Sequence, residues 1–106
     1  MRSDIQQHHE VDENGRPNGG ETVGRGFHIQ WQAGPLAVDG VRKEPNGAFA
    51  EDILAAVIGR VKFYQNSEFH SIHNAVALGH LYAAAEALAE RTRDRESRGV
   101  EGTHQK

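Results

Sequence analysis

Apolar side chains follow two different periods along this chain, and the change from one to the other falls near residue 46. The segment 27–32 alternates apolar and polar side chains, which is the period-two pattern of a half-buried strand. From Phe49 to Tyr64 apolar residues recur with helical spacing, which predicts a helix over residues 47–65. Asn46, directly before this run, is expected to cap the start of the helix.

A second run of helical spacing follows a short polar connection at residues 66–71. Its positions alternate between steps of three and four residues, as in a helix packed against an antiparallel neighbour; they are Leu78, Leu81, Ala85, Leu88 and Thr92. Gly99 favours the end of this helix, because glycine readily adopts the left-handed conformation after a last helical turn. The sequence therefore predicts a mainly α fold, an antiparallel two-helix hairpin preceded by a short β-strand.

The first 26 residues contain almost no large apolar side chain after Val11, and Asn14-Gly15 and Gly19-Gly20 are turn signals. Such a stretch buries too little apolar surface to offset the entropy lost on ordering it. We therefore expect residues 1–26 to be a flexible, disordered N-terminal tail. Residues 27–106 would then form the ligand-binding domain, a strand plus the helical hairpin.

A domain of this size has a small core. Domains below roughly 70–80 residues rarely stabilise themselves without disulfides, metals or partners, and this chain contains no cysteine. We therefore expect a homo-oligomer. Leu54, Ile58 and the strand face that carries Trp31 are the candidate contacts between copies.

Composition narrows the function classes further. The formal net charge of −3 argues against a protein that binds long nucleic acid through bulk electrostatics. The sequence has no apolar run long enough to span a membrane and no signal peptide, so we expect no membrane partner and a cytoplasmic location.

Four arginines, Arg91, Arg93, Arg95 and Arg98, gather within one short segment. Arg91 and Arg95 are one helical turn apart on the same face, and two adjacent guanidinium groups match phosphate oxygens in geometry and charge. The alternative is a solvated helix face, because Asp94 and Glu96 lie between the arginines.

Two other candidate contacts have an equally ordinary alternative. Tyr64 and Phe69 bracket the connection between the helices, where they could stack a base or simply close the end of the hairpin core. Asn74 could read a base edge or cap the second helix.

Metal binding and catalysis find little support in the sequence. His73 and His80 share a helix face, but no carboxylate with ligand-like spacing joins them. No hydrolase or phosphate-loop motif occurs. We therefore expect no catalytic residue, no metal and no cofactor.

Several short motifs together resemble a known family. They are Gln32-Ala33-Gly34-Pro35-Leu36, Asn46-Gly47-Ala48-Phe49, Phe63-Tyr64-Gln65, Asn74-Ala75, Arg91-Thr92, Arg95 and, most specifically, Arg98-Gly99-Val100-Glu101-Gly102-Thr103-His104. Over about residues 27–104 the chain resembles the phage hairpin-domain family shared by Thoeris anti-defence and anti-CBASS proteins. That resemblance implies a sponge, which binds a cyclic ADP-ribose isomer or a cyclic di- or trinucleotide of bacterial immunity without cleaving it.

The resemblance also implies site residues and an assembly. Tyr64 matches an aromatic that stacks on the base, Asn74 a polar contact, and Arg91 with Arg95 the pair that holds phosphates, while Thr103 matches a contact from a covering loop. Family members form dimers or hexamers with pockets between protomers. Asn74 and Arg91 are 17 positions apart, about 25 Å along one helix, so a pocket shared by two chains is expected. The alternatives are a phosphodiesterase acting on such a messenger and a structural or protein-binding hairpin.

Overall fold

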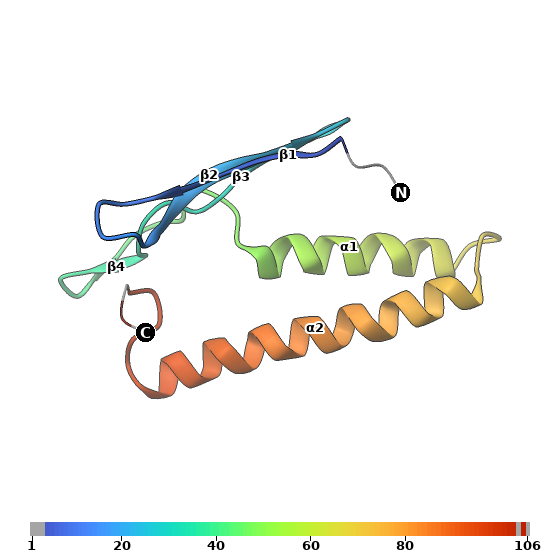
Figure 1. Cartoon of the computed structure of the whole chain (residues 1–106). Helices are drawn as coiled ribbons and strands as arrows, with labels where there is room; N and C mark the ends of the chain where they lie inside the picture. Colours follow the sequence, from blue (N-terminus) through green and yellow to red (C-terminus); the bar gives the residue numbers. More distant parts are fainter. Residues whose placement is uncertain (1–3, 104, 106) are drawn as a thin grey trace. The chain divides into compact units, whose positions relative to one another are not determined.

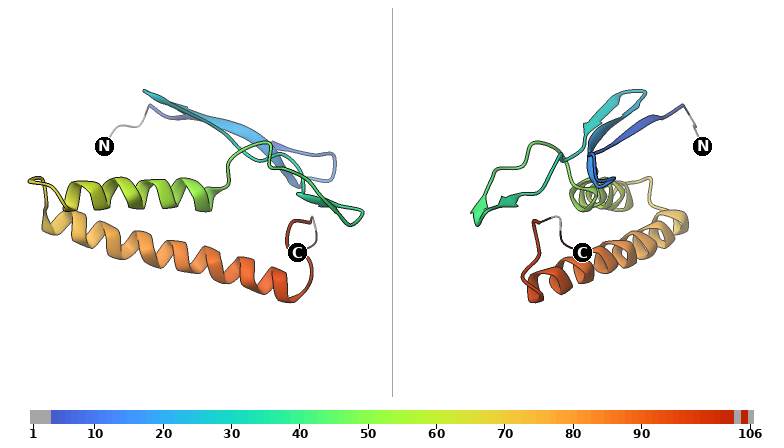
Figure 2. Two further views of the ribbon diagram at one scale, coloured as in Figure 1. Left: turned by 180° about the vertical axis from the view of Figure 1, so that it is seen from behind. Right: turned by 60° about the vertical axis from the view of Figure 1, so that its left-hand side comes forward.

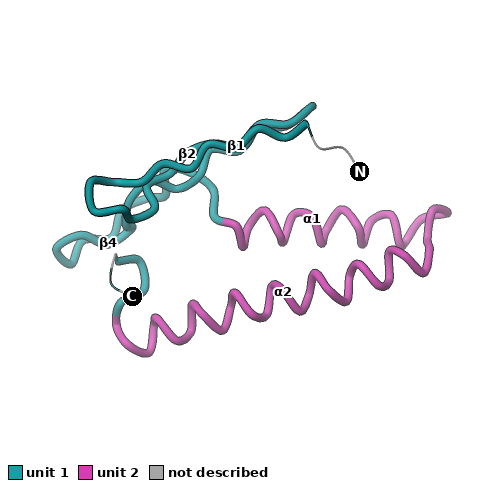
Figure 3. The backbone as a smooth tube through the Cα atoms, in the orientation of Figure 1, with its two compact units in different colours: residues 1–49, 100–106 teal, residues 50–99 magenta. Residues whose placement is uncertain are grey.

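The structure, a computed structural model, describes residues 4–103 and 105. The chain divides into two compact units, residues 1–49 with 100–106, and residues 50–99 (Figure 3). The first unit contains β1 (Gln6–Val11), β2 (Pro17–Gly24), β3 (Phe27–Gln30), β4 (Ala37–Val38) and β5 (Val41–Arg42). The second contains α1 (Ala50–Gln65) and α2 (Ile72–Ser97) (Figure 1).

A three-stranded antiparallel sheet in the order β1-β2-β3 occupies the N-terminal part of the chain. The β1–β2 turn is built around Asp12, whose Oδ1 accepts hydrogen bonds from Asn14 N at 2.8 Å and Arg16 N at 3.0 Å. Gly15 completes the turn at φ +77°. A short polar side chain that bonds its own backbone is what nucleates a turn of this kind.

Gly20 lets β1 and β2 approach closely. Its φ is +114°, and a Cβ atom built there would lie 2.0 Å from His8 O. The register shifts between His9 and Val11, next to this contact. A side chain at residue 20 would therefore separate the two strands.

One row of polar side chains crosses the sheet. Trp31 Nε1 donates a hydrogen bond of 2.8 Å to Thr22 Oγ1, which in turn donates to Gln7 Oε1 at 3.1 Å. Thr22 is only 6% exposed, so these partners satisfy a hydroxyl that water cannot reach.

The segment 100–103 packs on β4 and β5 within the same unit. Leu36 and Val100 are both buried, and Ala37 N donates a hydrogen bond of 2.8 Å to Gly102 O. Arg42 forms a two-pronged ion pair with Glu101, with N–O distances of 2.8 and 3.1 Å. These contacts hold the C-terminal segment in a defined position.

These sheets show that the predicted fold class is wrong. The chain is not a helical hairpin preceded by one short strand and a disordered tail, because residues 6–11 and 17–24 form two strands of a three-stranded sheet and a two-stranded sheet follows. The strands escaped prediction because most of their side chains are exposed and polar. Backbone pairing and turn chemistry define this sheet rather than a stripe of apolar residues.

The second unit consists of two helices that lie side by side and antiparallel (Figure 2). Ser71 caps α2, since its hydroxyl accepts a hydrogen bond of 3.0 Å from Asn74 N.

The positions expected to form the seam of α2 are all half-buried, from Leu78 to Thr92. In α1, Leu54 and Ile58 are half-buried, whereas Val57 and Tyr64 are exposed. Leu54 and Ile58, considered above as contacts between copies, therefore have the burial expected of seam positions.

Asn46 does not cap α1. Its side chain instead accepts a hydrogen bond of 2.8 Å from Ala33 N and donates one of 3.0 Å to Ala33 O, and the helix begins four residues later at Ala50. Neither helix in the described part of the chain combines the length and apolar character that a membrane span requires.

Candidate functional site

Tyr64 lies in the last turn of α1 and is 40% exposed. Arg60, one turn earlier, donates a hydrogen bond of 3.2 Å from Nη2 to the Tyr64 hydroxyl. The Arg60 Cζ atom lies over two rings, 4.9 Å from the Tyr64 centroid and 5.2 Å from the Phe63 centroid. The two rings meet edge to face with centroids 6.0 Å apart. The predicted aromatic contact is therefore part of a cation–π cluster, Arg60–Phe63–Tyr64.

Sequence reasoning missed Arg60. The signal was available, because residues four apart on a helix are neighbours and an arginine four positions before a tyrosine can lie on its ring.

Asn74 lies in the first turn of α2. Its Nδ2 atom donates a hydrogen bond of 3.1 Å to Phe69 O, which fixes the side chain against the connection between the helices. Capping is performed by Ser71 rather than by Asn74. Gln65 reinforces the same corner, donating to Ser71 O at 3.1 Å and accepting from Ser71 N at 3.0 Å.

Arg91 and Arg95 lie in the C-terminal part of α2. The Arg91 side chain is 63% exposed, and its Nη2 atom donates a hydrogen bond of 3.0 Å to Glu51 Oε1 in the first turn of α1. Arg95 is half-buried. The helix keeps these two arginines one turn apart, as their spacing predicts.

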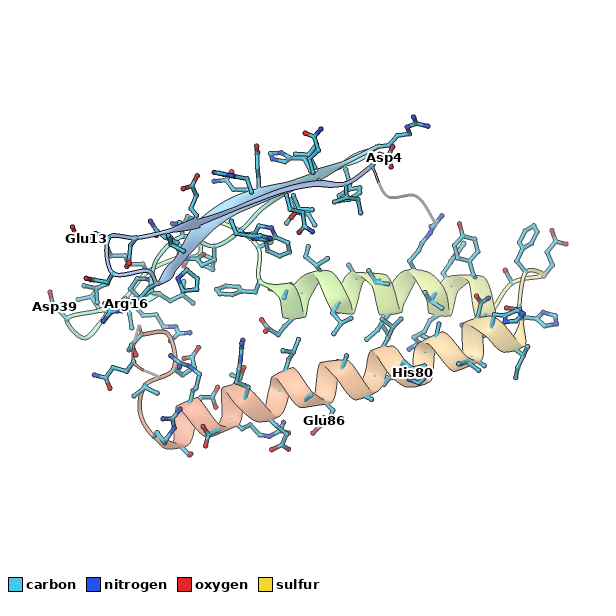
Figure 4. The ribbon with its side chains drawn as sticks, in the orientation of Figure 1. Asp4, Glu13, Arg16, Asp39, His80 and Glu86 are labelled. Carbon is cyan, nitrogen blue, oxygen red and sulfur yellow. The ribbon has the colours of Figure 1, made fainter. Side chains whose placement is uncertain are left out.

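The remaining arginines of the cluster pair with carboxylates on their own helix. Arg93 donates hydrogen bonds to Glu90 and also to Glu86, the latter at 2.7 Å. The bond to Glu90 and then the bond to Glu86 raise the pKa of Arg93. Arg98 bonds Asp94 at 3.1 Å. Glu86 projects from the side of α2 away from α1 (Figure 4). Much of the arginine-rich segment therefore carries balanced charge.

The helical unit separates its predicted contacts into two groups. Tyr64 and Asn74 flank the connection between the helices, whereas Arg91 and Arg95 are near the far end of α2. Asn74 and Arg91 belong to one unbroken helix, so about 25 Å separates them along its axis. One pair of helices does not bring the two groups together.

Thr103 belongs to the other unit. Its hydroxyl donates a hydrogen bond of 2.6 Å to Val100 O and accepts one of 3.2 Å from Gln105 N. Arg42, through Glu101, anchors the segment on which Thr103 lies. His104, from the same motif, lies outside the described residues.

The histidines of the described residues form no metal centre: in that part of the chain no three His, Asp or Glu side chains come together as metal ligands would. Two of them pair with carboxylates on the three-stranded sheet, His8 with Glu10 at 2.6 Å and His28 with Glu21 at 2.8 Å.

Comparison with known proteins gives the family. No family model matches the chain. The chain is 45% identical over 78 residues to a curated protein of Bacillus phage SBSphiJ7, "Thoeris anti-defense 1", an alignment that covers 74% of this chain and 52% of the relative. The chain belongs to the Thoeris anti-defence family. It spans about half the length of the curated relative that it matches.

Within this Thoeris anti-defence family member, the residues to which the resemblance gives a ligand role lie in three places. Tyr64 and Asn74 are at the helix connection, Arg91 and Arg95 near the end of α2, and Thr103 in the other unit. Their roles stay predictions.

Proposed function

We propose that this protein is a phage counter-defence protein that binds and sequesters a cyclic nucleotide of bacterial immunity in the host cytoplasm. The observation that carries the proposal is the 45% identity, over 74% of the chain, to a phage protein named for anti-defence against Thoeris. The ligand class is a cyclic ADP-ribose isomer or a cyclic di- or trinucleotide.

The chemistry of the helical unit supports this ligand class. A cyclic nucleotide offers two features to a protein, flat bases and phosphate groups. Tyr64 provides an exposed aromatic ring on which a base can stack. Arg91 and Arg95 provide guanidinium groups one turn apart, which suit phosphate oxygens.

The separation of these residues supports a homo-oligomer, a dimer or a hexamer. About 25 Å along α2 lies between Asn74 and Arg91, which exceeds what one small ligand spans. A pocket that combines both groups therefore needs the helix connection of one chain and the α2 end of another. Large apolar side chains are exposed at and near the connection, as expected of a surface that a second copy covers: Phe63, Phe69, Ile72 and Val76.

Sequestration requires slow release rather than chemistry. The chain offers no nucleophile–base motif of the known hydrolase families. In a pocket closed between chains, desolvation of the bound phosphates would slow dissociation, which is what a protein that removes a messenger needs. A phosphodiesterase acting on the same messenger is the competing interpretation.

One experiment separates these functions. The protein is incubated with cyclic ADP-ribose or with 3′,3′-cyclic di-AMP, the free ligand is removed by gel filtration, and the protein is heat-denatured. Intact nucleotide in the supernatant supports sequestration, whereas cleavage products identify an enzyme. If no probe is retained and none raises the melting temperature at fixed protein concentration, the proposed function is wrong for these ligands.

A further inference from the structure

Arg60 differs from three other arginines of the helical unit in the kind of group that it contacts. Arg91, Arg93 and Arg98 each bond a carboxylate. Among the described residues, Arg60 forms no ion pair and contacts aromatic groups instead, the Tyr64 hydroxyl and the Phe63 and Tyr64 rings. Its positive charge therefore lies next to aromatic rings, and no carboxylate of the described residues pairs with it.

This arrangement is suited to a nucleotide. A guanidinium group has five N–H donors, and the hydrogen bond to Tyr64 uses one nitrogen of the three. Donors remain for phosphate oxygens, which guanidinium groups bind in a bidentate manner. The Tyr64 residue is still 40% exposed, so part of its surface remains for a base.

Contacts within α1 also restrict the position of the charge. Arg60 and Tyr64 are one turn apart on α1, and two ring contacts and one hydrogen bond restrict the long arginine side chain. A side chain that is already ordered loses less conformational entropy on binding, which favours affinity.

We infer that Arg60 is a third ligand-binding arginine and that it forms one recognition unit with Tyr64. The base of a nucleotide stacks on the Tyr64 ring while Arg60 binds a phosphate attached to the same nucleoside. This inference rests on the proposed function and adds to it, because it places a phosphate contact at the helix connection as well as at the end of α2.

Binding constants of matched variants test the inference. The probe is cyclic ADP-ribose or 3′,3′-cyclic di-AMP, whichever the wild-type protein binds, and the measurement is isothermal titration calorimetry. Arg60→Ala is expected to weaken binding by about tenfold or more, the loss of one charge-assisted hydrogen-bonding group. Lys62→Ala is the control, because it removes the same charge from an exposed position of the same helix; it should change the dissociation constant by less than about twofold.

Two further variants separate charge from geometry. Arg60→Lys keeps the charge but not the planar donors, so it should restore only part of the affinity. Tyr64→Phe keeps the ring and removes the hydroxyl that holds Arg60, so it should weaken binding less than Arg60→Ala does. Arg60→Met keeps the apolar stem and serves in place of Arg60→Ala if that variant fails to fold.

The outcomes distinguish this inference from the proposed function. If the wild-type protein binds neither probe, the proposed function and the Arg60 assignment both fail. If the wild-type protein binds and Arg60→Ala matches Lys62→Ala, the assignment alone fails, and the cation–π cluster only stabilises α1. A tenfold loss that is specific to Arg60 supports the recognition unit.

Discussion

Arg91 and Glu51 join the C-terminal part of α2 to the first turn of α1 through a hydrogen bond of 3.0 Å. The proposed phosphate-binding guanidinium therefore already has an anionic partner. A phosphate that binds Arg91 must share it with this carboxylate or displace it, and the carboxylate repels the ligand.

Glu51→Gln should therefore raise the affinity for a cyclic nucleotide by about three- to tenfold, since the neutral amide no longer repels a phosphate. The unfolding free energy should change by less than about 1 kcal/mol, because exposed ion pairs contribute little. Isothermal titration calorimetry, with the cyclic nucleotide that the wild-type protein binds, measures the affinity, and urea unfolding measures the stability. Glu90→Gln, next to Arg93, is the control. A lower affinity would mean that Glu51 orients Arg91 for binding instead.

Replacing Arg91 and Arg95 together with alanine should weaken nucleotide binding by about a hundredfold or more, because two charge-assisted contacts are lost. The oligomer should persist, as measured by light scattering. The double variant Arg93→Ala, Arg98→Ala removes the same charge from the same part of the chain and should bind nearly normally, since neither residue is among the proposed ligand contacts and both pair with neighbouring carboxylates instead. Equal losses in both variants would point to bulk charge instead of a specific pair.

The ion pair between Arg42 and Glu101 should control the order of the segment that carries Thr103. Glu101→Gln removes the charge that Arg42 binds, so amide hydrogen exchange at residues 100–103 should become faster. Global stability should fall by no more than about 1 kcal/mol, because the Arg42 side chain is largely exposed. The exchanged pair Arg42→Glu, Glu101→Arg should restore slow exchange. Unchanged protection in Glu101→Gln would show that backbone contacts such as Ala37 N to Gly102 O hold the segment alone.

Two glycine variants test the N-terminal sheet directly. Gly20→Ala should destabilise the protein by about 3 kcal/mol or more, because its Cβ would overlap His8 O and its φ is positive. Gly15→Ala has a positive φ but no atom within 4 Å of the added Cβ, so it should cost only about 1 kcal/mol. Urea unfolding followed by the fluorescence of Trp31, which bonds the same sheet, measures both. Equal stabilities would be inconsistent with the close approach of β1 and β2.

The two helices and the strand β3, which lies within the predicted segment 27–32, were readable from the sequence, whereas β1 and β2 were not, for a physical reason. The helix pattern depends on apolar side chains at steps of three and four, and positions such as Leu81 and Leu88 are indeed half-buried. The strands β1 and β2 expose most of their side chains, so their sequence carries no apolar alternation. Their signals were a turn centred on Asp12 and a glycine at a crowded position, and both also occur in flexible segments.

The candidate site divides in the same way. The spacing of Arg91 and Arg95 could be read from helical geometry alone. The pairing of Arg91 with Glu51 could not, because it joins residues 40 positions apart through tertiary structure. The contact between Arg60 and Tyr64 could not be predicted without knowing which face of α1 stays exposed. The sequence pattern had assigned Tyr64 to the apolar stripe, where its ring would be covered.

The cation–π cluster has a consequence for molecular discrimination. Because the Arg60 guanidinium already lies over the Tyr64 ring, a base must stack on the part of the ring that the guanidinium does not cover. Its sugar and phosphate then have to run in one direction to reach the charge. Two messengers with identical atoms but different glycosidic linkages would direct their phosphates differently, so a single fixed side chain could separate such isomers without any contact to the ribose.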